Sequence, residues 1–492
     1  MSKRPFSLFA AVAALPLLTQ TAGAQNDAND LPWATEQVVV IDGDVSEWPE
    51  DSYIAVTEHH VAIRFRLRGV VTPTRAPMPI QVHADIDGYA PTGEAIYGMG
   101  ADVRIVLSDP NRTERGPRIT VIGLDENEPP KPIEPSDIGL IFAPTHAGDW
   151  IEMRFDRLSK HRPAAPARMD GRPVIPVMQF RAYAGGQRAI APEGGSFRAK
   201  LRPDSGRAGF ADETVPDAAP GSVRVMSWNV LWGGPTENPA PFARVIEAIK
   251  PDVILFQEWQ RDDIAGETIA AWLNEHATWA GTDWEAQAPD AWGPGLAARH
   301  RMTHKGPRDI KAGGTRWNFP IRLAAASIDV PGYGPVVFGS IHFKAGGYLG
   351  SEEDHRRITE AAAVNDVLRD LRDDSGARAV VFGGDLNMNG TTAIIPTATD
   401  GLDSDGSVLD VVPVGVLGDP GATYTFGRPG QHSTFPRLDY ITIPDAGADV
   451  TAAFVFDPTR LTNEALSRMG VQREDVMASD HLPVVVDIKF ND

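Results

Sequence analysis

The sequence predicts an antiparallel β-sandwich followed by a layered α/β domain. From about residue 33 to residue 200, apolar residues alternate with polar ones, which is the two-residue period of half-buried strands. From residue 222 to residue 492, strand-like apolar runs alternate with segments of helical period. Residues 201–221 are rich in Pro, Gly, Ala and Asp and lack any apolar period. We therefore expect a linker or docking strap there, and a fragment beginning near Pro220 to fold and keep its activity.

The composition sets the class of protein. With 492 residues and 42% hydrophobic content, the chain is long enough for two or three packed domains. The 46 Lys and Arg residues against 66 Asp and Glu residues give a formal charge of -20. A broad basic surface for polyanions is therefore not expected. Because the chain has no cysteine, it has no disulfides and no acylated Cys to serve as a lipoprotein anchor.

The first 24 residues read as a signal peptide. Lys3 and Arg4 supply a positive start, Phe6–Leu18 is an apolar run too short to span a bilayer, and a small-residue Ala-Gly-Ala cleavage site follows. A buried N-terminal helix is the alternative, which the three regions in order disfavour. The mature protein is expected to begin at Gln25 and to be exported to the periplasm or the medium. No other stretch is long and apolar enough for a membrane span.

The strands expected before residue 200 show the two-residue period directly. They contain the alternating apolar sets Val61, Ile63, Phe65 and Leu67; Ile80, Val82, Ala84 and Ile86; Val103, Ile105 and Leu107; and Ile151, Met153 and Phe155. The segments VVVIDGDVSEWPE and HADIDGYAPTG resemble family 9-like carbohydrate-binding modules. This resemblance implies a polysaccharide as a partner of the first domain.

An Asp-x-Asp-Gly sequence in the second of these segments has two interpretations. Asp85 and Asp87 have the oxygen ligands that Ca²⁺ prefers, but the same sequence is a common turn. Because the remaining ligands of a calcium site are missing, the turn is favoured.

Helical period marks two segments of the second domain. Phe242, Val245, Ile246 and Ile249 lie on one helical face directly before the apolar run at Val253–Phe256. A longer helix before Val380 is marked by Ile358, Ala362, Asn365, Leu368 and Leu371.

The run VVFGGDLNMNG ends in two polar side chains two residues apart, Asp385 and Asn387. Because residues two apart in a strand point to the same side, the end of this strand presents a carboxylate beside an amide. Taken alone, GD-x-N is also an ordinary turn sequence. Other apolar runs, however, also end in or carry polar groups, at Asn229, Glu258, His342, Asp439, and Asp480 with His481. Burying such groups unpaired costs several kcal/mol, so we expect them to meet.

The ordered set SWNV, QE, IHFK, GDLN, LDY and SDH resembles the endonuclease/exonuclease/phosphatase superfamily, which has the DNase I-like fold. The resemblance covers about residues 222–490, and every polar position of the pattern is present. It implies a four-layer sandwich of two mixed sheets with outer helices and the site at one edge.

The resemblance also implies a role for each polar residue. Glu258 and Asp480 would hold Mg²⁺, for which Mn²⁺ may substitute, and Asp385 would orient and deprotonate water. His481, oriented by Asp439, and His342 would donate to phosphoryl oxygens. The amides of Asn229 and Asn387 would bind the phosphate and the water.

Several positions keep a structural interpretation beside the functional one. Asp439 could pair with Arg437, His342 could be a core histidine, and Asn389 is read as a turn residue. Lys344 and the Ala-Gly-Gly after it could hold a second phosphate or headgroup, although glycine loops are common. The tryptophans near the motifs are expected in the core, with one or two at the rim: Trp228, Trp232, Trp259, Trp292 and Trp317.

Together these observations predict an exported, Mg²⁺-dependent phosphoesterase that acts on a phosphodiester or phosphomonoester by in-line attack of water. The net charge favours a small or lipid-like substrate. The alternatives are an extracellular nuclease acting on DNA and a non-catalytic, sugar-binding scaffold protein. The motifs do not choose among nucleic acid, lipid, sugar and inositol phosphates, because loops set the substrate on a shared fold.

Overall fold

The computed structural model describes most of the chain after the expected signal peptide. The described residues are 31–86, 93–96, 99–108, 118–121, 131–157, 168–169, 172–173, 177–201, 210–259, 265–277, 279, 281, 283–289, 293–312, 319–427 and 436–491. The expected signal peptide, Asp87, Trp292 and Trp317 lie outside these residues, so the interpretations that rest on them stay predictions.

The N-terminal domain consists of two sheets in which all the strand pairs are antiparallel except β1 with β2. The first sheet has the order β1 (Thr35–Glu36), β2 (Ile54–Val56), β3 (His60–Val71), β11 (Gly148–Asp156) and β10 (Ile141–Ala143). The second has the order β15 (Gln187–Arg188), β14 (Val177–Ala184), β4 (Ile80–Asp85), β7 (Val103–Ser108), β8 (Arg118–Val121) and β9 (Lys131–Ile133), with β16 (Ser196–Lys200) also paired to β14. One hydrophobic cluster joins the two sheets. The predicted antiparallel sheet domain is confirmed.

Short elements complete this domain. Two small hairpins pair β5 (Glu94–Ile96) with β6 (Met99–Ala101) and β12 (Arg168–Met169) with β13 (Arg172–Pro173). Its 3-10 helices are η2 (Val45–Glu47), η3 (Pro73–Arg75), η4 (Pro135–Ile138) and η5 (Glu193–Gly195).

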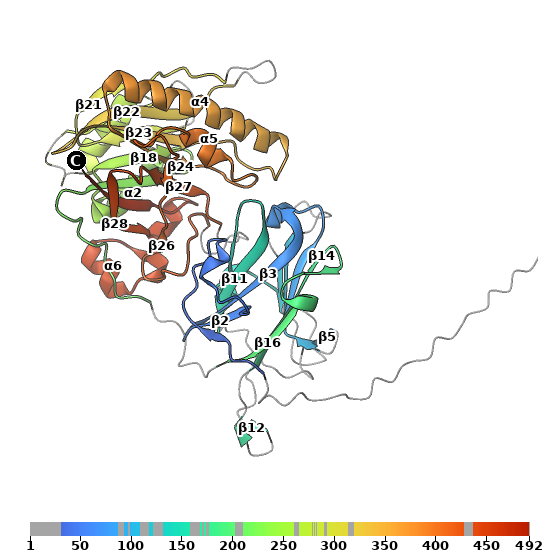
Figure 1. The fold of residues 1–492 in the computed structure, drawn as a ribbon. Helices are drawn as coiled ribbons and strands as arrows, with labels where there is room; N and C mark the ends of the chain where they lie inside the picture. The colour runs from blue at the N-terminus through green and yellow to red at the C-terminus, as the bar shows by residue number, and fades with distance from the viewer. Residues whose placement is uncertain are drawn as a thin grey trace, which may run out of the picture.

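The C-terminal domain contains two further sheets, both mixed. One has the order β19 (Glu285–Gln287), β20 (Gly295–Ala298), β18 (Val253–Gln257), β17 (Val223–Asn229), β29 (Val484–Phe490), β28 (Ala448–Val455) and β26 (Gly415–Val416). The other has the order β21 (Met302–Lys305), β22 (Leu323–Val330), β23 (Gly334–His342), β24 (Ala379–Asp385), β27 (Asp439–Ile443) and β25 (Asp410–Val411). Figure 1 shows this domain, coloured green to red, beside the blue-to-green N-terminal sheets.

Helices cover the outer faces of the two mixed sheets. The helices on the side of β17 and β18 are α1 (Gly234–Glu237), α2 (Pro239–Ile249), α3 (Gly266–His276) and α6 (Asn463–Met469), with η7 (Pro458–Arg460) and η8 (Arg473–Ala478) nearby. On the side of β23 and β24 are α4 (Glu352–Ser375) and α5 (Ile394–Thr399). Separate hydrophobic clusters lie under each helical layer and between the sheets. The predicted four-layer arrangement is confirmed.

The longest helix, α4, has clear start and stop signals. The Ser351 side chain accepts a hydrogen bond from the Asp354 amide, acidic residues fill the first turn, and Gly376 ends the helix with φ of 64°. The helix matches the sequence prediction: of the residues that marked it, Asn365, Leu368 and Leu371 are buried and Ile358 is partly buried, whereas Ala362 is exposed and its neighbour Ala361 is buried. The buried face of α4 packs against β22, β23 and β24.

The N-terminal domain is packed against the C-terminal one. Ala62 on β3 and Ile141 on β10 belong to the same hydrophobic cluster as the residues between the two mixed sheets. Both NH groups of Arg154 donate to the carboxylate of Asp419 in a buried ion pair, at 2.7 and 2.6 Å. One face of the first sheet is therefore an interface.

The second half of the expected linker is a strap on the C-terminal domain. Ala211 forms an isolated parallel bridge with Leu461, and Asp212 accepts a hydrogen bond from Arg468. The Pro216 carbonyl accepts one from Arg224. Of the two interpretations of residues 201–221, the described part fits the docking strap. No helix in the described parts of the chain combines the length and the apolar character needed to cross a membrane.

Candidate active site

Three of the predicted polar residues lie side by side at one end of a sheet. His342, the last residue of β23, is the register partner of Asp385, the last residue of β24. Asp385 is in turn the register partner of Asp439, the first residue of β27. All three side chains are buried. The motifs IHFK, GDLN and LDY are therefore brought together because each lies at the same edge of adjacent strands.

The other mixed sheet brings Asn229 and Glu258 to the same place. Asn229 ends β17 beside Gln257 of β18, and Glu258 follows directly with φ of 57°. The Asn229 amide nitrogen lies 3.3 Å from Glu258 Oε1 and 3.2 Å from Asp385 Oδ2. This one amide therefore connects the two sheets. A left-handed backbone at a residue such as Glu258 costs free energy and is typical of functional sites.

His481 lies between two carboxylates. Its Nδ1 atom is 2.8 Å from Asp439 Oδ2, and its Nε2 atom is 3.7 Å from Asp385 Oδ2. The Thr425 hydroxyl donates to the same Asp439 oxygen at 2.6 Å. The ring of Phe426 packs edge-on against the imidazole, with 4.9 Å between the centroids. The alternative pairing of Asp439 with Arg437 does not form a hydrogen bond, since Arg437 donates to the Val412 carbonyl instead.

The charges in this cluster are mutually dependent. Burial acts to lower the pKa of His481, but the carboxylates of Asp439 and Asp385 outweigh it and raise the pKa to about 10. Burial is also the main reason why the pKa of Asp385 rises to about 7, against the opposing effect of His481. We therefore expect a charged imidazolium on His481 at neutral pH. Asp385 can exchange a proton near neutrality.

His342 is held in one neutral tautomer. Arg322 donates an NH group to His342 Nδ1 at 3.0 Å and another to the Phe343 carbonyl at 2.7 Å. Because Nδ1 accepts this bond, the ring proton must be on Nε2. Nε2 lies 3.5 Å from Asp385 Oδ2 and 3.7 Å from Glu258 Oε1. Burial, followed by the charge of Arg322, holds the pKa of His342 well below its usual value.

Asn387 is fixed by its backbone and its side chain. It has φ of 46°, its amide donates to Asp385 Oδ1 at 3.0 Å, and its Nδ2 atom donates to the Phe343 carbonyl at 3.3 Å. Asn389 donates back to the Asn387 carbonyl from its backbone and its side chain, which agrees with its interpretation as a turn residue. The loop after β24 is therefore tightly folded around the carboxylate of Asp385.

The donor set fits a hard divalent cation. Glu258 Oε2 is buried and has no hydrogen-bond partner among the residues that the structure describes. Burial raises the pKa of Glu258, and the nearby charge of Asp480 raises it further, which puts these carboxylates close to each other. The described residues contain no group of three or more acidic or histidine side chains arranged as a metal cage. Two carboxylates with water completing the shell suit Mg²⁺, which keeps several of its waters.

The sequence that forms this site matches a known protein family. Residues 226–481 match the model of the Endonuclease/Exonuclease/phosphatase family, which is just over half of the chain. The chain belongs to this family. Members of the endonuclease/exonuclease/phosphatase family hydrolyse phosphoester bonds, generally with divalent metal ions, and the present chain is a hydrolase of this type.

Several solved structures are similar to part of this chain. The catalytic domain of human Nocturnin with bound sulfate is 17% identical with a TM-score of 0.36, covering 57% of this chain and 97% of that one. The family protein from Bacteroides vulgatus is 14% identical with a TM-score of 0.38, covering 55% and 99%. The one from Beutenbergia cavernae is 22% identical with a TM-score of 0.34, covering 55% and 72%. No curated protein matches the chain.

All eight predicted site residues are described. Seven are linked to the cluster by the contacts above, and Asp480 by its charge on Glu258 and His481. The sequence did not identify Arg322 or Thr425, which hold His342 and Asp439. Ser479, which donates to the Asn229 carbonyl and accepts from the His481 amide, was also missed although it belongs to the motif SDH.

The other candidates of the endonuclease/exonuclease/phosphatase domain have structural positions. Trp228 and Trp259 are buried in the core, as expected, while Trp232 is partly exposed. The glycine loop after Lys344 is held from inside, since Arg357 donates to the carbonyls of Lys344 and Gly346. The carbonyls of Lys344 and Gly346 are therefore bonded within the protein, and the interpretation of Lys344 with its glycine loop as a phosphate or headgroup site stays a prediction.

Replacing Arg322 with Met tests its role in this family member. Methionine fills a similar volume but cannot donate to His342 Nδ1, so the ring loses its fixed tautomer. We expect kcat to fall by about 10- to 100-fold, the usual cost of losing the group that orients a site residue. Steady-state kinetics with a thermal unfolding control measures this. Arg322→Lys should recover only part of kcat because one ammonium cannot replace two directed NH groups; wild-type kcat in Arg322→Met would exclude the role.

Proposed function

We propose that the chain is an exported, Mg²⁺-dependent phosphoesterase that hydrolyses a phosphodiester or phosphomonoester by in-line attack of water. The observation that supports it most is the meeting of His342, Asp385, Asp439 and His481 at one edge, with the unpartnered oxygen of Glu258 beside them. Hydrolysis of a phosphoester by water is assisted by a base for the water, a charged donor and a bound cation, and this cluster has candidates for all three in Asp385, His481 and Glu258.

Asp385 is the group that activates water in this proposal. Its pKa, raised to about 7 by burial, suits a general base near neutral pH. The Asn387 amide occupies Asp385 Oδ1, while Oδ2 faces Asn229, His342 and His481. Oδ2 is therefore the oxygen to which we assign the proton of the attacking water. As the water oxygen bonds to phosphorus, the bond to the leaving oxygen breaks on the opposite side.

His481 supplies positive charge where negative charge develops. Its Nδ1–H donates to Asp439, so the Nε2–H is directed at the site from a ring that cannot rotate. A preorganised charged donor stabilises the transition state because its orientation is fixed before the reaction. Neutral His342 adds an Nε2–H from the other side, and Asn229 adds an amide.

Glu258 and Asp480 would hold the divalent cation, which when bound offsets negative charge on the phosphoryl and leaving oxygens. The unpartnered Oε2 of Glu258 is the atom free for this role. Asn229 donates to Glu258 Oε1 and so fixes the carboxylate. The identity of the cation as Mg²⁺ is part of the proposal.

The substrate is proposed to be a small or lipid-like phosphoester. The formal charge of -20 disfavours a polymer that carries one negative charge per nucleotide, because nonspecific nucleic-acid binding relies on clustered Lys and Arg. DNA is the second candidate substrate.

Activity against a substrate panel tests the proposal. Purified protein is assayed on soluble phosphomonoesters, soluble and lipid phosphodiesters, and DNA, each with Mg²⁺ and with a chelator. We expect Mg²⁺-dependent turnover of a small or lipid-like phosphoester, at a higher kcat/KM than that for DNA. Asp385→Asn, which keeps the shape of the side chain, is the control for contaminating activity. Turnover that persists in the chelator, or in this variant, would contradict the proposed mechanism.

Export and sugar binding are further parts of the proposal. Export is supported by the positive charge and the apolar run at the N-terminus. The test is whether the exported protein has the mass of a chain that begins at Gln25. Sugar binding is supported by the resemblance of the first domain alone. In the segment that carries this resemblance, Trp48 is buried and donates to Glu152, and the Gly43 amide donates to the same carboxylate. These residues therefore stabilise the fold of the domain. Retention of the protein on insoluble polysaccharide tests sugar binding.

A further inference from the structure

We infer that the N-terminal β-sandwich is a positioning component of the active site, fastened by Thr72 and Thr145 to the segments that carry the proposed catalytic residues. The inference rests on the proposed function, since it concerns the same site. It replaces the expectation that the C-terminal domain works as an independent unit. Two separate sets of contacts between the domains, which we call seams, support the inference. One lies at the loop after β24, and the other lies at the residues just before β27.

The first seam holds the loop that contains Asn387. Two and three residues after Asn387, the carbonyls of Asn389 and Gly390 accept hydrogen bonds from the N-terminal domain. The Thr72 hydroxyl donates to the Asn389 carbonyl at 2.8 Å, and the Ala147 amide donates to the Gly390 carbonyl at 2.8 Å. Both donors come from the N-terminal domain. The loop that begins at Asp385 is thus closed by groups that the catalytic domain does not supply.

The same Thr72 hydroxyl also joins a second loop. It accepts a hydrogen bond from the Leu349 amide at 3.0 Å, in the segment that follows His342. Because the oxygen donates to one loop and accepts from the other, its orientation is determined. Asp354 on α4 makes the equivalent connection inside the catalytic domain, accepting from Gly350 at 2.9 Å and from Thr391 at 3.0 Å. Thr72, which is 3% exposed, completes this clamp from the other side.

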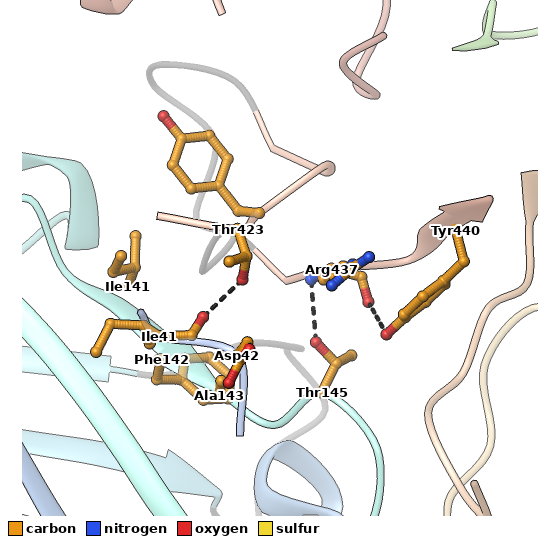
Figure 2. Close-up of a pocket in the computed structure, with 10 residues that line it drawn as sticks. Ile41, Asp42, Ile141, Phe142, Ala143, Thr145, Thr423, Arg437 and Tyr440 are labelled. Atoms are coloured by element: carbon orange, nitrogen blue, oxygen red, sulfur yellow. Dashed lines mark hydrogen bonds between the residues drawn. The ribbon is translucent and has the colours of Figure 1, made fainter. Parts of the chain in front are cut away.

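The second seam lies behind the Asp439–His481 pair and is shown in Figure 2. Thr145 Oγ1 accepts a hydrogen bond from the Arg437 amide at 3.1 Å, two residues before Asp439. On the neighbouring segment, Thr423 donates to the Ile41 carbonyl at 2.6 Å, two residues before the Thr425 that holds Asp439. The segments on both sides of the Asp439 carboxylate are therefore attached to the sandwich.

The seam in Figure 2 is structural rather than a substrate pocket. Its cavity measures about 10 Å³ between residues such as Asp42, Thr145 and Arg437, which is room for one water at most. Tyr440 donates to the Arg437 carbonyl there, so this turn is bonded on both sides. Because this contact region has so little free space, a displacement of the N-terminal sandwich would also displace the start of β27.

The interface is firm enough to position a catalytic group. Apolar residues of the first sheet share a hydrophobic cluster with the catalytic core, and the Arg154–Asp419 pair is bidentate and buried. Domains joined only by a flexible linker have smaller, more polar contacts. Catalysis requires the reacting groups to be held within a fraction of an ångström, and a misplacement of about 1 Å can cost about 100-fold in rate.

Single hydroxyl deletions in the full-length chain test the inference. Thr72→Val and Thr145→Val keep the branched shape but remove the hydrogen bonds, so we expect kcat to fall by about 10-fold or more with little change in KM. Thr72→Ser and Thr145→Ser keep the hydroxyl and should restore most of kcat. The control is Thr35→Val, which removes a hydrogen bond to Ser52 inside the sandwich and should keep wild-type kcat.

Amide hydrogen exchange provides a readout that does not need activity. In Thr72→Val we expect faster exchange in residues 385–391, while the central strand residues 323–330 exchange as in the wild type. If the wild type hydrolyses no phosphoester, the proposed function fails, and the exchange result still decides the inference. Wild-type kcat in both Val variants, or unchanged exchange in the loop, would overturn it. A loss of kcat that the Ser variants do not restore would also overturn it.

Discussion

Asp439→Asn and His481→Ala are each expected to lower kcat by roughly 10²- to 10⁴-fold, the range for losing a positioned acid or its orienting partner. Asparagine can keep a carbonyl oxygen where Asp439 Oδ2 lies, so the contacts from Thr425 and His481 survive while the negative charge is lost. His481 then loses the carboxylate that most raises its pKa. The proportion of charged imidazolium falls, and with it the stabilisation of the transition state.

The double variant shows whether the two residues act as a unit. If Asp439 works only through His481, the combined change should lower kcat little more than the worse single change, because coupled residues are non-additive. Steady-state kinetics of the wild type, the two single variants and the double variant completes this double-mutant cycle. Unfolding temperatures show whether each variant is folded. The exposed His355, replaced by alanine, is the matched control and should keep wild-type kcat. Losses that multiply in the double variant would show independent roles.

Glu258→Gln is expected to lower kcat/KM at low Mg²⁺ by roughly 100-fold or more, since a bound cation supplies several kcal/mol of charge stabilisation. The amide keeps one oxygen ligand but removes the negative charge at Oε2, the oxygen without a partner in the described part of the chain. Activity should therefore recover in part at high Mg²⁺ or Mn²⁺. Titration of Mg²⁺ by calorimetry should show weaker binding, independently of any substrate.

The control for Glu258 is Glu237→Gln, which makes the same chemical change on an exposed residue of α1. It should leave both the activity and the Mg²⁺ affinity at the wild-type values. Full activity of Glu258→Gln at low Mg²⁺ would remove Glu258 from the cation site. If calorimetry showed unchanged Mg²⁺ binding while activity was lost, the carboxylate would have a different role.

The sequence was sufficient for the main layers of the fold, and the polar residues that it singled out lie together in the structure. The two-residue period identified the N-terminal sheets, and the alternation of strands and helices identified the layered domain. The polar residues at strand ends could be grouped because adjacent strands in a sheet end at common edges. This is why His342, Asp385 and Asp439, taken from three separate motifs, are register neighbours.

The residues that orient the site were decided by the tertiary structure. Arg322 lies 20 residues from His342 in the chain, and Thr425 lies 14 residues from Asp439, so no local spacing connects either pair. Which tautomer His342 adopts follows from Arg322 alone. A pattern of apolar and polar residues records burial and period, but it does not record which distant donor reaches which acceptor.

The sequence likewise did not predict how the two domains contact each other. The composition of residues 201–221 fits a flexible linker, and the alternation in β3 fits a sheet with one polar face. In the folded chain, Ala62 and Arg64 of that face are buried while Arg66 and Arg68 stay exposed, and Thr72 lies against Asn389, 317 residues further along. The sequence determined the strands and the chemistry at their ends, because period and side-chain type are local properties. Only the tertiary structure determined how the sandwich meets the catalytic loops, because contacts at such separation depend on the packing of complete surfaces.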